Sequence, residues 1–402
     1  MELGDALAWL DRHDPPVSRP GVADRAGSER VRALLDVLGN PERSMPVVVV
    51  SGRRGKTAVV RAIGALIGSK GLSVGTVTSP HLSRVNERLA VGGEVVGDSA
   101  LAELLSDLAV LEPLLAGVVP ARAELLLAGG LSWFSDRPVH AAVLEAGSET
   151  TDPVAGIGAV VEVTTGLGAV VSGDAETWDD ERAPDTHRWV PGADFGCSRH
   201  RSAVGGRSVD VWTPGATYEG VWLGVHGRHQ ADNFAVALAA SEAFFGAPIE
   251  EGLVREAAAG WRLPGQLEVV GHRPTVLVDT ASDPLGASSV AATLDEDFAV
   301  CASRIVVLGL RDDADPAEML SALGAGRARL VVACDPGEPG TRSAGEVARA
   351  AADSGVEVVE RDSVAAAVHA GVGAARPDDL VLIVGPPAMI GSARVALGAR
   401  AG

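Results

Sequence analysis

The chain has 402 residues, enough for roughly two to three domains that bury their cores without disulfide or metal staples. Hydrophobic residues make up 47% and charged residues 22%, which excludes a disordered protein, and no apolar run approaches the roughly 18 residues of a membrane span. The 34 basic and 53 acidic side chains give a net charge of -19, which argues against a nucleic-acid partner.

The cysteines and the first residues of the chain bear on its compartment. Cys197, Cys301 and Cys334 are widely scattered and show neither zinc-binding nor disulfide spacing. The opening sequence lacks the basic start, the apolar core and the cleavage site of an export signal. These features predict a cytoplasmic protein that has no zinc site and no membrane association.

The first half alternates β-branched runs with segments of helical periodicity, which predicts buried, parallel strands. Two helices are expected before the first strand. We then expect strands at 46–50, 74–77 and 140–145, and helices after residue 55, at 101–115 and at 124–134. From 172 to 201 the periodicity disappears and Asp, Glu, Arg and Pro dominate, so a long surface loop is predicted there.

The second half predicts a further α/β unit. A hairpin at 209–212 and 220–223 is followed by helices at 232–245 and 250–259. Leu-Pro-Gly at 263–265 is a natural break, and we place a domain boundary there. Beyond it, Ala-rich helices alternate with strands expected at 275–279, 305–310, 330–334, 356–360 and 380–384, the pattern of an open α/β fold.

A Ser-Gly-Arg-Arg-Gly-Lys-Thr sequence joins the first strand to its helix. In that context backbone N–H groups and the helix N-terminus bind phosphate oxygens, Lys56 neutralises phosphate charge and Thr57 reaches Mg²⁺. The general signature has an earlier glycine where this chain has Val50, so the match is to a shorter Gly-x-x-Gly-Lys-Thr form. A plain glycine turn at Gly52 and Gly55 is the alternative.

The order of motifs along the chain resembles folylpolyglutamate synthase and dihydrofolate synthase, members of the Mur ligase superfamily. Eight motifs, too many in one order to be chance, carry this resemblance from end to end. They are Leu-Gly-Asn-Pro at 38–41, the loop at 52–57, Thr-Ser-Pro-His-Leu at 78–82 with Asn-Glu-Arg at 86–88, Leu-Glu-Ala-Gly at 144–147, Gly-Arg-His-Gln-Ala-Asp-Asn at 227–233, Leu-Pro-Gly-Gln-Leu-Glu at 263–268, Asp-Thr-Ala-Ser-Asp-Pro at 279–284 and Val-Gly-Pro-Pro-Ala-Met-Ile-Gly at 384–391.

The resemblance implies a Mur ligase-like α/β fold. A phosphate-loop ATPase domain with a parallel sheet would span 1–265, and a smaller Rossmann-like ligase domain would span 266–402. It implies an ATP-dependent ligase that converts a small-molecule carboxylate into an acyl phosphate, which an amine or an amino acid such as glutamate then attacks. ATP and Mg²⁺ are the implied cofactors, and the resemblance leaves open whether the protein is a monomer or an oligomer.

The resemblance also implies which residues bind the nucleotide. Asn233 corresponds to the asparagine that meets adenine, and Asp279 to the aspartate that holds the ribose. Gln266 stands where the family has an arginine that meets the γ-phosphate. From the sequence alone, Asn233 is equally well a helix cap. The predicted nucleotide-binding set is Gly52, Arg53, Gly55, Lys56, Thr57, Asn233, Gln266 and Asp279.

Thr57, Ser79 and Glu145 are implied as Mg²⁺ ligands, because hydroxyl and carboxylate oxygens suit this hard ion. Each has an ordinary structural alternative. Glu145 at a strand end is also consistent with a solvated carboxylate, and Ser79 before Pro80 with a turn residue.

Several departures from the family concern the chemistry. Arg53 and Arg54 replace Thr-Asn in the loop, and Gly-Ala at 168–169 replaces an Asp-His that supplies a metal ligand. The family's carbamoylated lysine aligns with Arg182, and the chain has no lysine besides Lys56 and Lys70. We therefore expect one Mg²⁺ ion rather than two. Lys56 and Arg182 are the predicted catalytic residues, with the Arg182 guanidinium replacing part of the lost charge; a solvated loop arginine is the alternative.

Further departures lie in the second half. Ser282 replaces a histidine, and Arg-Asp-Asp at 311–313 replaces Asp-Lys-Asp, while Arg262 lies near enough in sequence to compensate in part for Gln266. Losing positioned phosphate clamps weakens transition-state stabilisation. A nucleotide-binding pseudoenzyme or a regulatory partner of a related ligase is therefore the alternative to a ligase.

Overall fold

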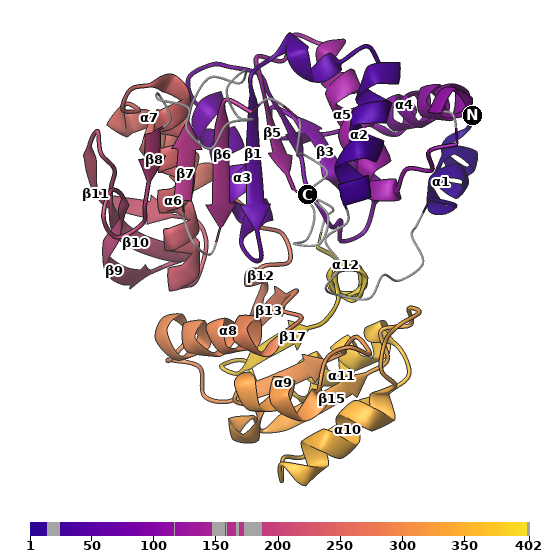
Figure 1. Ribbon diagram of the computed structural model, residues 1–402. Coiled ribbons are helices and arrows are strands. Elements are labelled where there is room, and N and C mark those ends of the chain that lie inside the picture. Colours follow the sequence, from indigo (N-terminus) through magenta and orange to yellow (C-terminus); the bar gives the residue numbers. More distant parts are fainter. Residues whose placement is uncertain are drawn as a thin grey trace.

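The computed structural model describes residues 1–13, 25–115, 117–146, 157, 159–165, 169–172 and 187–399. Two α/β bodies follow one another along the chain, each built on its own sheet, with a smaller third sheet beside the first body (Figure 1). No helix among these residues is long and apolar enough to cross a bilayer.

The first body is built on an eight-stranded sheet. Its strands are β1 (Val47–Gly52), β2 (Val74–Val77), β3 (Leu89–Val91), β4 (Glu94–Val95), β5 (Ala141–Glu145), β6 (Val161–Thr165), β7 (Ala169–Ser172) and β8 (His187–Trp189). They lie in the order β4-β3-β2-β5-β1-β6-β7-β8. The central strands β2, β5, β1 and β6 are parallel, whereas the edge strands are antiparallel. This confirms the predicted parallel sheet for β1, β2 and β5; β6 was not predicted.

Helices cover both faces of this sheet. They are α1 (Leu3–Asp11), α2 (Arg25–Val37), α3 (Lys56–Gly68), α4 (Asp98–Leu111), α5 (Arg122–Ser135), α6 (Arg228–Phe245) and α7 (Glu251–Gly260), with 3-10 turns at Pro41–Ser44, Val85–Arg88 and Glu112–Leu115. Successive side chains of β1 point to opposite faces. Val48 and Val50 pack with α3 and α6, whereas Val47 and Val49 pack with α1, α2, α4 and α5. Burial on both faces explains the uninterrupted valine run.

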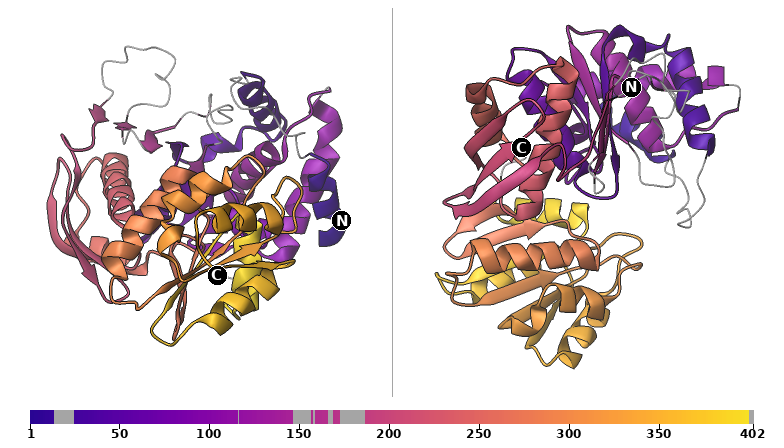
Figure 2. Two further views of the ribbon diagram at one scale, coloured as in Figure 1. Left: turned by 90° about the horizontal axis from the view of Figure 1, so that it is seen from below. Right: turned by 60° about the vertical axis from the view of Figure 1, so that its left-hand side comes forward.

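A three-stranded antiparallel sheet flanks α6 and reaches toward the second body (Figure 2). Its strands are β9 (Gly196–Ala203), β10 (Gly206–Trp212) and β11 (Thr217–Leu223). The prediction of a continuous loop from 172 to 201 is wrong where the structure describes this segment, because β8 and β9 lie within it. Much of β9 is solvent-exposed and carries arginine, so it lacks an apolar pattern, and its backbone pairing with β10 makes it a strand.

The second body is a six-stranded sheet with helices on both faces. Its strands are β12 (Glu268–His272), β13 (Thr275–Asp279), β14 (Arg304–Leu308), β15 (Leu330–Cys334), β16 (Val358–Arg361) and β17 (Leu380–Val384), and its helices are α8 (Pro284–Asp297), α9 (Pro316–Ala322), α10 (Ala344–Asp353), α11 (Val364–Ala374) and α12 (Pro387–Ala396), with a 3-10 turn at Ala325–Arg327. The order is β12-β13-β17-β14-β15-β16, and only β12 is antiparallel to its neighbour. Helix α12 lies on the side that faces the first body (Figure 1).

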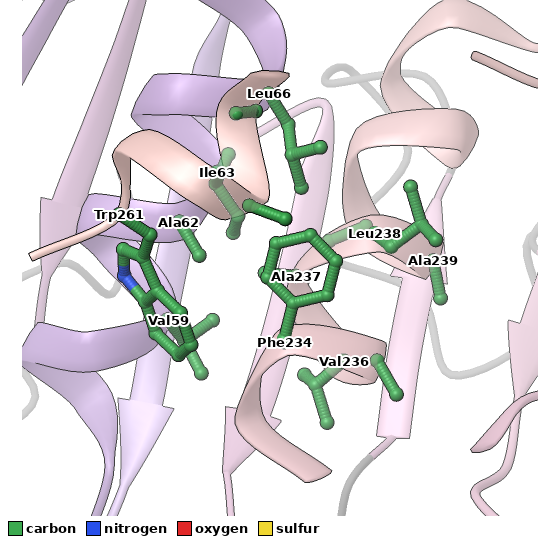
Figure 3. Packing of buried hydrophobic residues seen from close by; sticks show 14 of the residues in the cluster. Val59, Ala62, Ile63, Leu66, Phe234, Val236, Ala237, Leu238, Ala239 and Trp261 are labelled. Carbon is green, nitrogen blue, oxygen red and sulfur yellow. The ribbon is translucent and has the colours of Figure 1, made fainter. Parts of the chain in front are cut away.

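The contact between α3 and α6 holds the phosphate-loop helix against the sheet. Ile63 and Leu66 of α3 face Phe234 of α6, and the Trp261 ring closes the cluster (Figure 3). The Phe234 and Trp261 ring centroids are 5.6 Å apart. All four side chains are buried, so this packing fixes the position of the helix whose first residue is Lys56.

We expect Phe234→Ala to lower the free energy of unfolding by about 3–5 kcal/mol, because it leaves a cavity between α3 and α6. Thermal and urea denaturation would measure the loss. Val204→Ala is the control, because the Val204 side chain is 99% exposed and its truncation should change stability by less than about 0.5 kcal/mol. Similar stability of the two variants would contradict the packing described.

Candidate nucleotide and metal site

The phosphate loop leaves β1 at the carboxyl edge of the sheet, on the side of the second body (Figure 1). Gly52 and Gly55 have φ angles of +112° and +79°, in the region that favours glycine. A Cβ on Gly55 would lie 2.5 Å from Oδ1 of Asn233, and one on Gly52 would collide with Thr165. Both glycines are therefore required by space as well as by conformation, and the predicted residue Asn233 lies directly against the loop.

Lys56 begins α3, and its ammonium folds back over the loop. Its Nζ donates a hydrogen bond to the carbonyl oxygen of Gly52 at 2.9 Å. Arg53 and Arg54, between the two glycines, are exposed. Three cationic side chains thus belong to a loop of a few residues at the N-terminus of a helix, an arrangement suited to binding phosphate groups.

The three predicted metal ligands come together. Oε2 of Glu145, at the end of β5, accepts hydrogen bonds from the Thr57 hydroxyl at 2.8 Å and from the Ser79 N–H at 3.0 Å. The Thr57 hydroxyl also lies 3.3 Å from the Ser79 carbonyl oxygen. Residues from α3, from the loop after β2 and from β5 meet here because parallel strands end at one edge of the sheet.

Glu145 is 8% exposed, and burial raises the pKa of its carboxyl to about 7, although the Ser79 N–H, the Thr57 hydroxyl and the charge of Lys56 act in the opposite direction. A nearby cation would favour the ionised form. The oxygen donors fit Mg²⁺. Within the described ranges no three His, Cys, Asp or Glu residues cluster as a metal site, so phosphate oxygens and water would supply the remaining ligands.

A chain of side-chain amides runs from the loop to the second body. Nδ2 of Asn233 donates to Oε1 of Gln230 at 2.9 Å, and Nε2 of Gln230 donates to Oε1 of Gln266 at 3.3 Å. The structure thus connects two predicted nucleotide-binding residues through Gln230, which the sequence did not single out. Arg262 does not take the place of the missing arginine here, because its Nη1 donates to the carbonyl oxygens of Ala259 and Trp261.

Asp279 lies at the end of β13, where both carboxylate oxygens accept backbone N–H groups. Oδ2 accepts from Leu267 at 2.8 Å and Oδ1 from Ala281 at 2.7 Å. Burial raises the pKa of this carboxyl to about 6, against the effect of the two hydrogen bonds. Asp279 therefore holds the start of β12, where Leu267 has a φ angle of +47°; its contact with the ribose stays a prediction.

One contact at the loop was missed by the sequence analysis. Nη2 and Nε of Arg54 donate to the two oxygens of Asp283 at 2.7 and 3.2 Å, which joins the phosphate loop to the N-cap of α8. Part of the signal was present in the sequence, because Arg54 stands where the resembling family has a neutral asparagine. Arg182 lies outside the described residues, so its role stays a prediction, whereas Ala169, at the position of the family's metal-binding histidine, begins β7.

Known proteins resemble this chain over most of its length. A family model described as Mur ligase, glutamate ligase domain, matches residues 265–386. The dihydrofolate synthase/folylpolyglutamate synthase of Mycobacterium tuberculosis is 33% identical over 341 residues, which cover 70% of this chain and 69% of that protein. The chain belongs to the folylpolyglutamate synthase/dihydrofolate synthase family. This confirms the resemblance found in the motifs.

The structural comparison agrees with this membership. The structure of Mycobacterium tuberculosis folylpolyglutamate synthase complexed with ADP matches with a TM-score of 0.86 at 26% identity, and covers 100% of this chain and 99% of that chain. This chain spans about half of a Halobacterium salinarum relative, named as a probable bifunctional folylpolyglutamate synthase/dihydropteroate synthase, at 28% identity. The Mur ligase-like α/β fold is confirmed, and the family supports the ligase over the pseudoenzyme alternative.

The raised pKa of Glu145 predicts a pH dependence in the protein without metal or nucleotide. The folded state holds the proton up to about pH 7, whereas the unfolded carboxyl releases it near its ordinary value of 4.5, so this contribution to stability is lost as the pH rises between these values. Glu145→Gln should therefore match the wild type in Tm at pH 5 and exceed it by a few degrees at pH 8.

The control for this prediction is Glu94→Gln, because Glu94 is an exposed glutamate of β4. Its Tm difference from the wild type should not change with pH. A Glu145→Gln difference that is equally independent of pH would contradict the description of Glu145 as a buried carboxyl that titrates near neutrality.

Proposed function

We propose that this family member is a cytoplasmic ATP-dependent ligase that joins a carboxylate to the amine of an amino acid through an acyl phosphate, with ATP and Mg²⁺ as cofactors. The observation that carries this proposal is the meeting of Thr57, Ser79 and Glu145 beside the phosphate loop that begins α3. Acyl-phosphate formation requires such a site, because negative charge moves from the γ-phosphate toward the leaving ADP.

The phosphate loop would perform the first step of this reaction. Backbone N–H groups near Gly52 and Gly55 would hold the phosphates, and Lys56 would exchange its bond to the Gly52 carbonyl for a phosphate oxygen. Arg53 would add positive charge to this loop. Mg²⁺, held by Thr57, Ser79 and Glu145, would polarise the transferred phosphoryl group.

Asn233 of α6, in the first body, would meet the adenine. The second body would complete the nucleotide site, with Gln266 beside the terminal phosphates and Asp279 at the ribose. We propose 1–265 as the ATP-binding domain and 266–402 as the ligase domain. Closure of one domain on the other would bring the nucleotide-binding residues of the two domains together and exclude water from the acyl phosphate.

The names of the relatives suggest the substrates. Folylpolyglutamate and dihydrofolate synthases are named for folate-type products, and the family model that matches residues 265–386 describes a glutamate ligase domain. We propose a folate-type acid and glutamate as the first pair to test. ADP release that requires the acid and the amine together would support the ligase, whereas nucleotide binding without turnover for any acid–amine pair would contradict it.

The two lysines of the chain provide a matched pair of variants. ATP and Mg²⁺ should raise the Tm of the wild type. Lys56→Ala should abolish this shift without unfolding the protein, because it removes the phosphate-binding ammonium, and should lower ADP release at least about 100-fold. Lys70→Ala should retain both, because Lys70 lies 4.5 Å from the Phe245 ring centroid, away from the loop. An unchanged shift in Lys56→Ala would overturn the phosphate-loop assignment.

We also propose that Arg182 supplies positive charge where the family has a carbamoylated lysine, so that one Mg²⁺ ion suffices. Arg182→Ala should then lower turnover at least about tenfold, a loss of about 1.4 kcal/mol of transition-state stabilisation. Arg201→Ala is the control, because Arg201 is an exposed arginine of β9. Equal, negligible effects of the two substitutions would contradict this role and favour the alternative, in which Arg182 is a solvated loop arginine.

A further inference from the structure

A cavity of about 100 Å³ lies between the two bodies, next to the metal-ligand candidates. Its polar lining includes Thr57, Arg61 and Glu87 from the first body, Gln266 from the connection before β12, Thr280 from just after the end of β13, and Arg394 from α12. The cavity therefore shares Thr57 with the predicted metal site and Gln266 with the predicted nucleotide site, but most of this lining belongs to neither.

Arg61 is a cationic group of this cavity that has no role in the proposed reaction. Its side chain is half-buried, and it makes no hydrogen bond or ion pair with any residue that the structure describes. Burial lowers the pKa of its guanidinium from the usual value, and the charge of Arg394 acts in the same direction. A guanidinium has five N–H donors, and no nitrogen of Arg61 is among the buried, unpaired side-chain atoms of the described residues, so its donors are open to the cavity.

The acidic groups near Arg61 are already engaged by other donors. Glu87 accepts hydrogen bonds from the backbone N–H groups of Leu82, Ser83 and Arg84 at 2.8–3.0 Å. Arg394, the second cation of the cavity, has its Nε within 3.0 Å of Glu268. Glu87 and Glu145 raise the pKa of Arg61 through their charge, yet neither bonds to it. The hydrogen-bonding capacity of Arg61 is thus left for a ligand.

The position of Arg61 on α3 indicates which ligand group it would bind. Thr57 and Arg61 are four residues apart, so they lie on one face of the helix, about 5–6 Å from each other at Cβ. A carboxylate that is being phosphorylated must lie at the Thr57 end, against the γ-phosphate. A carboxylate bound by Arg61, one helical turn away, is not the group that is phosphorylated. The molecule that carries this carboxylate can instead place its amine at the reacting centre.

We propose that Arg61 binds a carboxylate of the acceptor amino acid, with Arg394 adding to the positive potential of the subsite. This inference rests on the proposed ligase function. It adds to that function a residue, Arg61, that selects an acceptor carrying a carboxylate. The planar guanidinium pairs with a carboxylate through two parallel hydrogen bonds. That pairing fixes the orientation of the acceptor, so its amine points toward the acyl phosphate near Thr57.

Steady-state kinetics with glutamate as the acceptor test this role. In Arg61→Met the KM for glutamate should rise at least about 30-fold, as for loss of a charge-assisted pair, whereas the KM values for ATP and for the acid should change less than about twofold. Arg61→Lys should recover part of the affinity, because lysine keeps the positive charge but cannot form the two parallel hydrogen bonds. Arg84→Met is the control, because Arg84 is exposed and pairs with Asp98.

Two further measurements separate this subsite from folding and from the ligase reaction. Arg61→Met should be at least as stable as the wild type, because it removes a half-buried charge that has no partner among the described residues. Calorimetric titration of glutamate into protein saturated with AMPPCP and Mg²⁺ should show binding to the wild type and to Arg84→Met. The same titration of Arg61→Met tests the contribution of this arginine. Replacing glutamate by 4-aminobutyrate tests the contribution of a carboxylate, and replacing it by glutarate tests that of the amine.

The outcomes distinguish the two proposals. Loss of glutamate binding in Arg61→Met upholds the subsite even if no acid–amine pair releases ADP, a result that would overturn only the ligase function. Equal glutamate binding by the wild type and Arg61→Met overturns the subsite, and so does the absence of glutamate binding to the wild type. A KM increase for the acid rather than for glutamate also overturns it, because Arg61 would then bind the other substrate.

Discussion

The hydrogen bonds to one buried carboxylate oxygen organise the site. Oε2 of Glu145 receives the Thr57 hydroxyl and the Ser79 N–H, so it joins the end of β5 to α3 and to the loop after β2. The valine-rich core beneath these strand ends places the three residues before any ligand arrives. The raised pKa of Glu145 reflects the same burial, and a divalent cation would relieve the cost of its ionised form.

The second constraint is that polar contacts join the second body to the phosphate loop and to the three-stranded sheet, beside the apolar contact that Leu82 makes with the core of the second body. Arg54 pairs with Asp283 at the phosphate loop, and the buried Arg207 of β10 pairs with the buried Asp297 of α8 at 3.0 Å. Polar interfaces of this kind are typical of domains that move relative to each other. Phosphates bound at the loop would compete with Asp283 for Arg54. Nucleotide binding would therefore be coupled electrostatically to the position of the second body.

Much of the fold and part of the site follow from the sequence, for identifiable reasons. Strands buried on both faces, such as β1 and β17, give continuous apolar runs that reveal them, and the loop glycines lie in their expected strand-to-helix context. Strand β9 has no such run, because it is half-exposed and depends on pairing with β10. The Arg54–Asp283 pair, and the lack of a partner for Arg61 among the described residues, depend on how distant segments approach, which residue patterns alone do not encode.

In the proposed reaction, ATP bound at the phosphate loop activates a carboxylate by phosphorylating it. Labelling the carboxyl oxygens of the acid substrate with ¹⁸O tests for this intermediate, because one carboxyl oxygen leaves with the phosphate when the amine attacks an acyl phosphate. We expect ¹⁸O in the inorganic phosphate, one atom for each amide bond formed. Amide formation with unlabelled phosphate, or ADP release with no amide product, would contradict it.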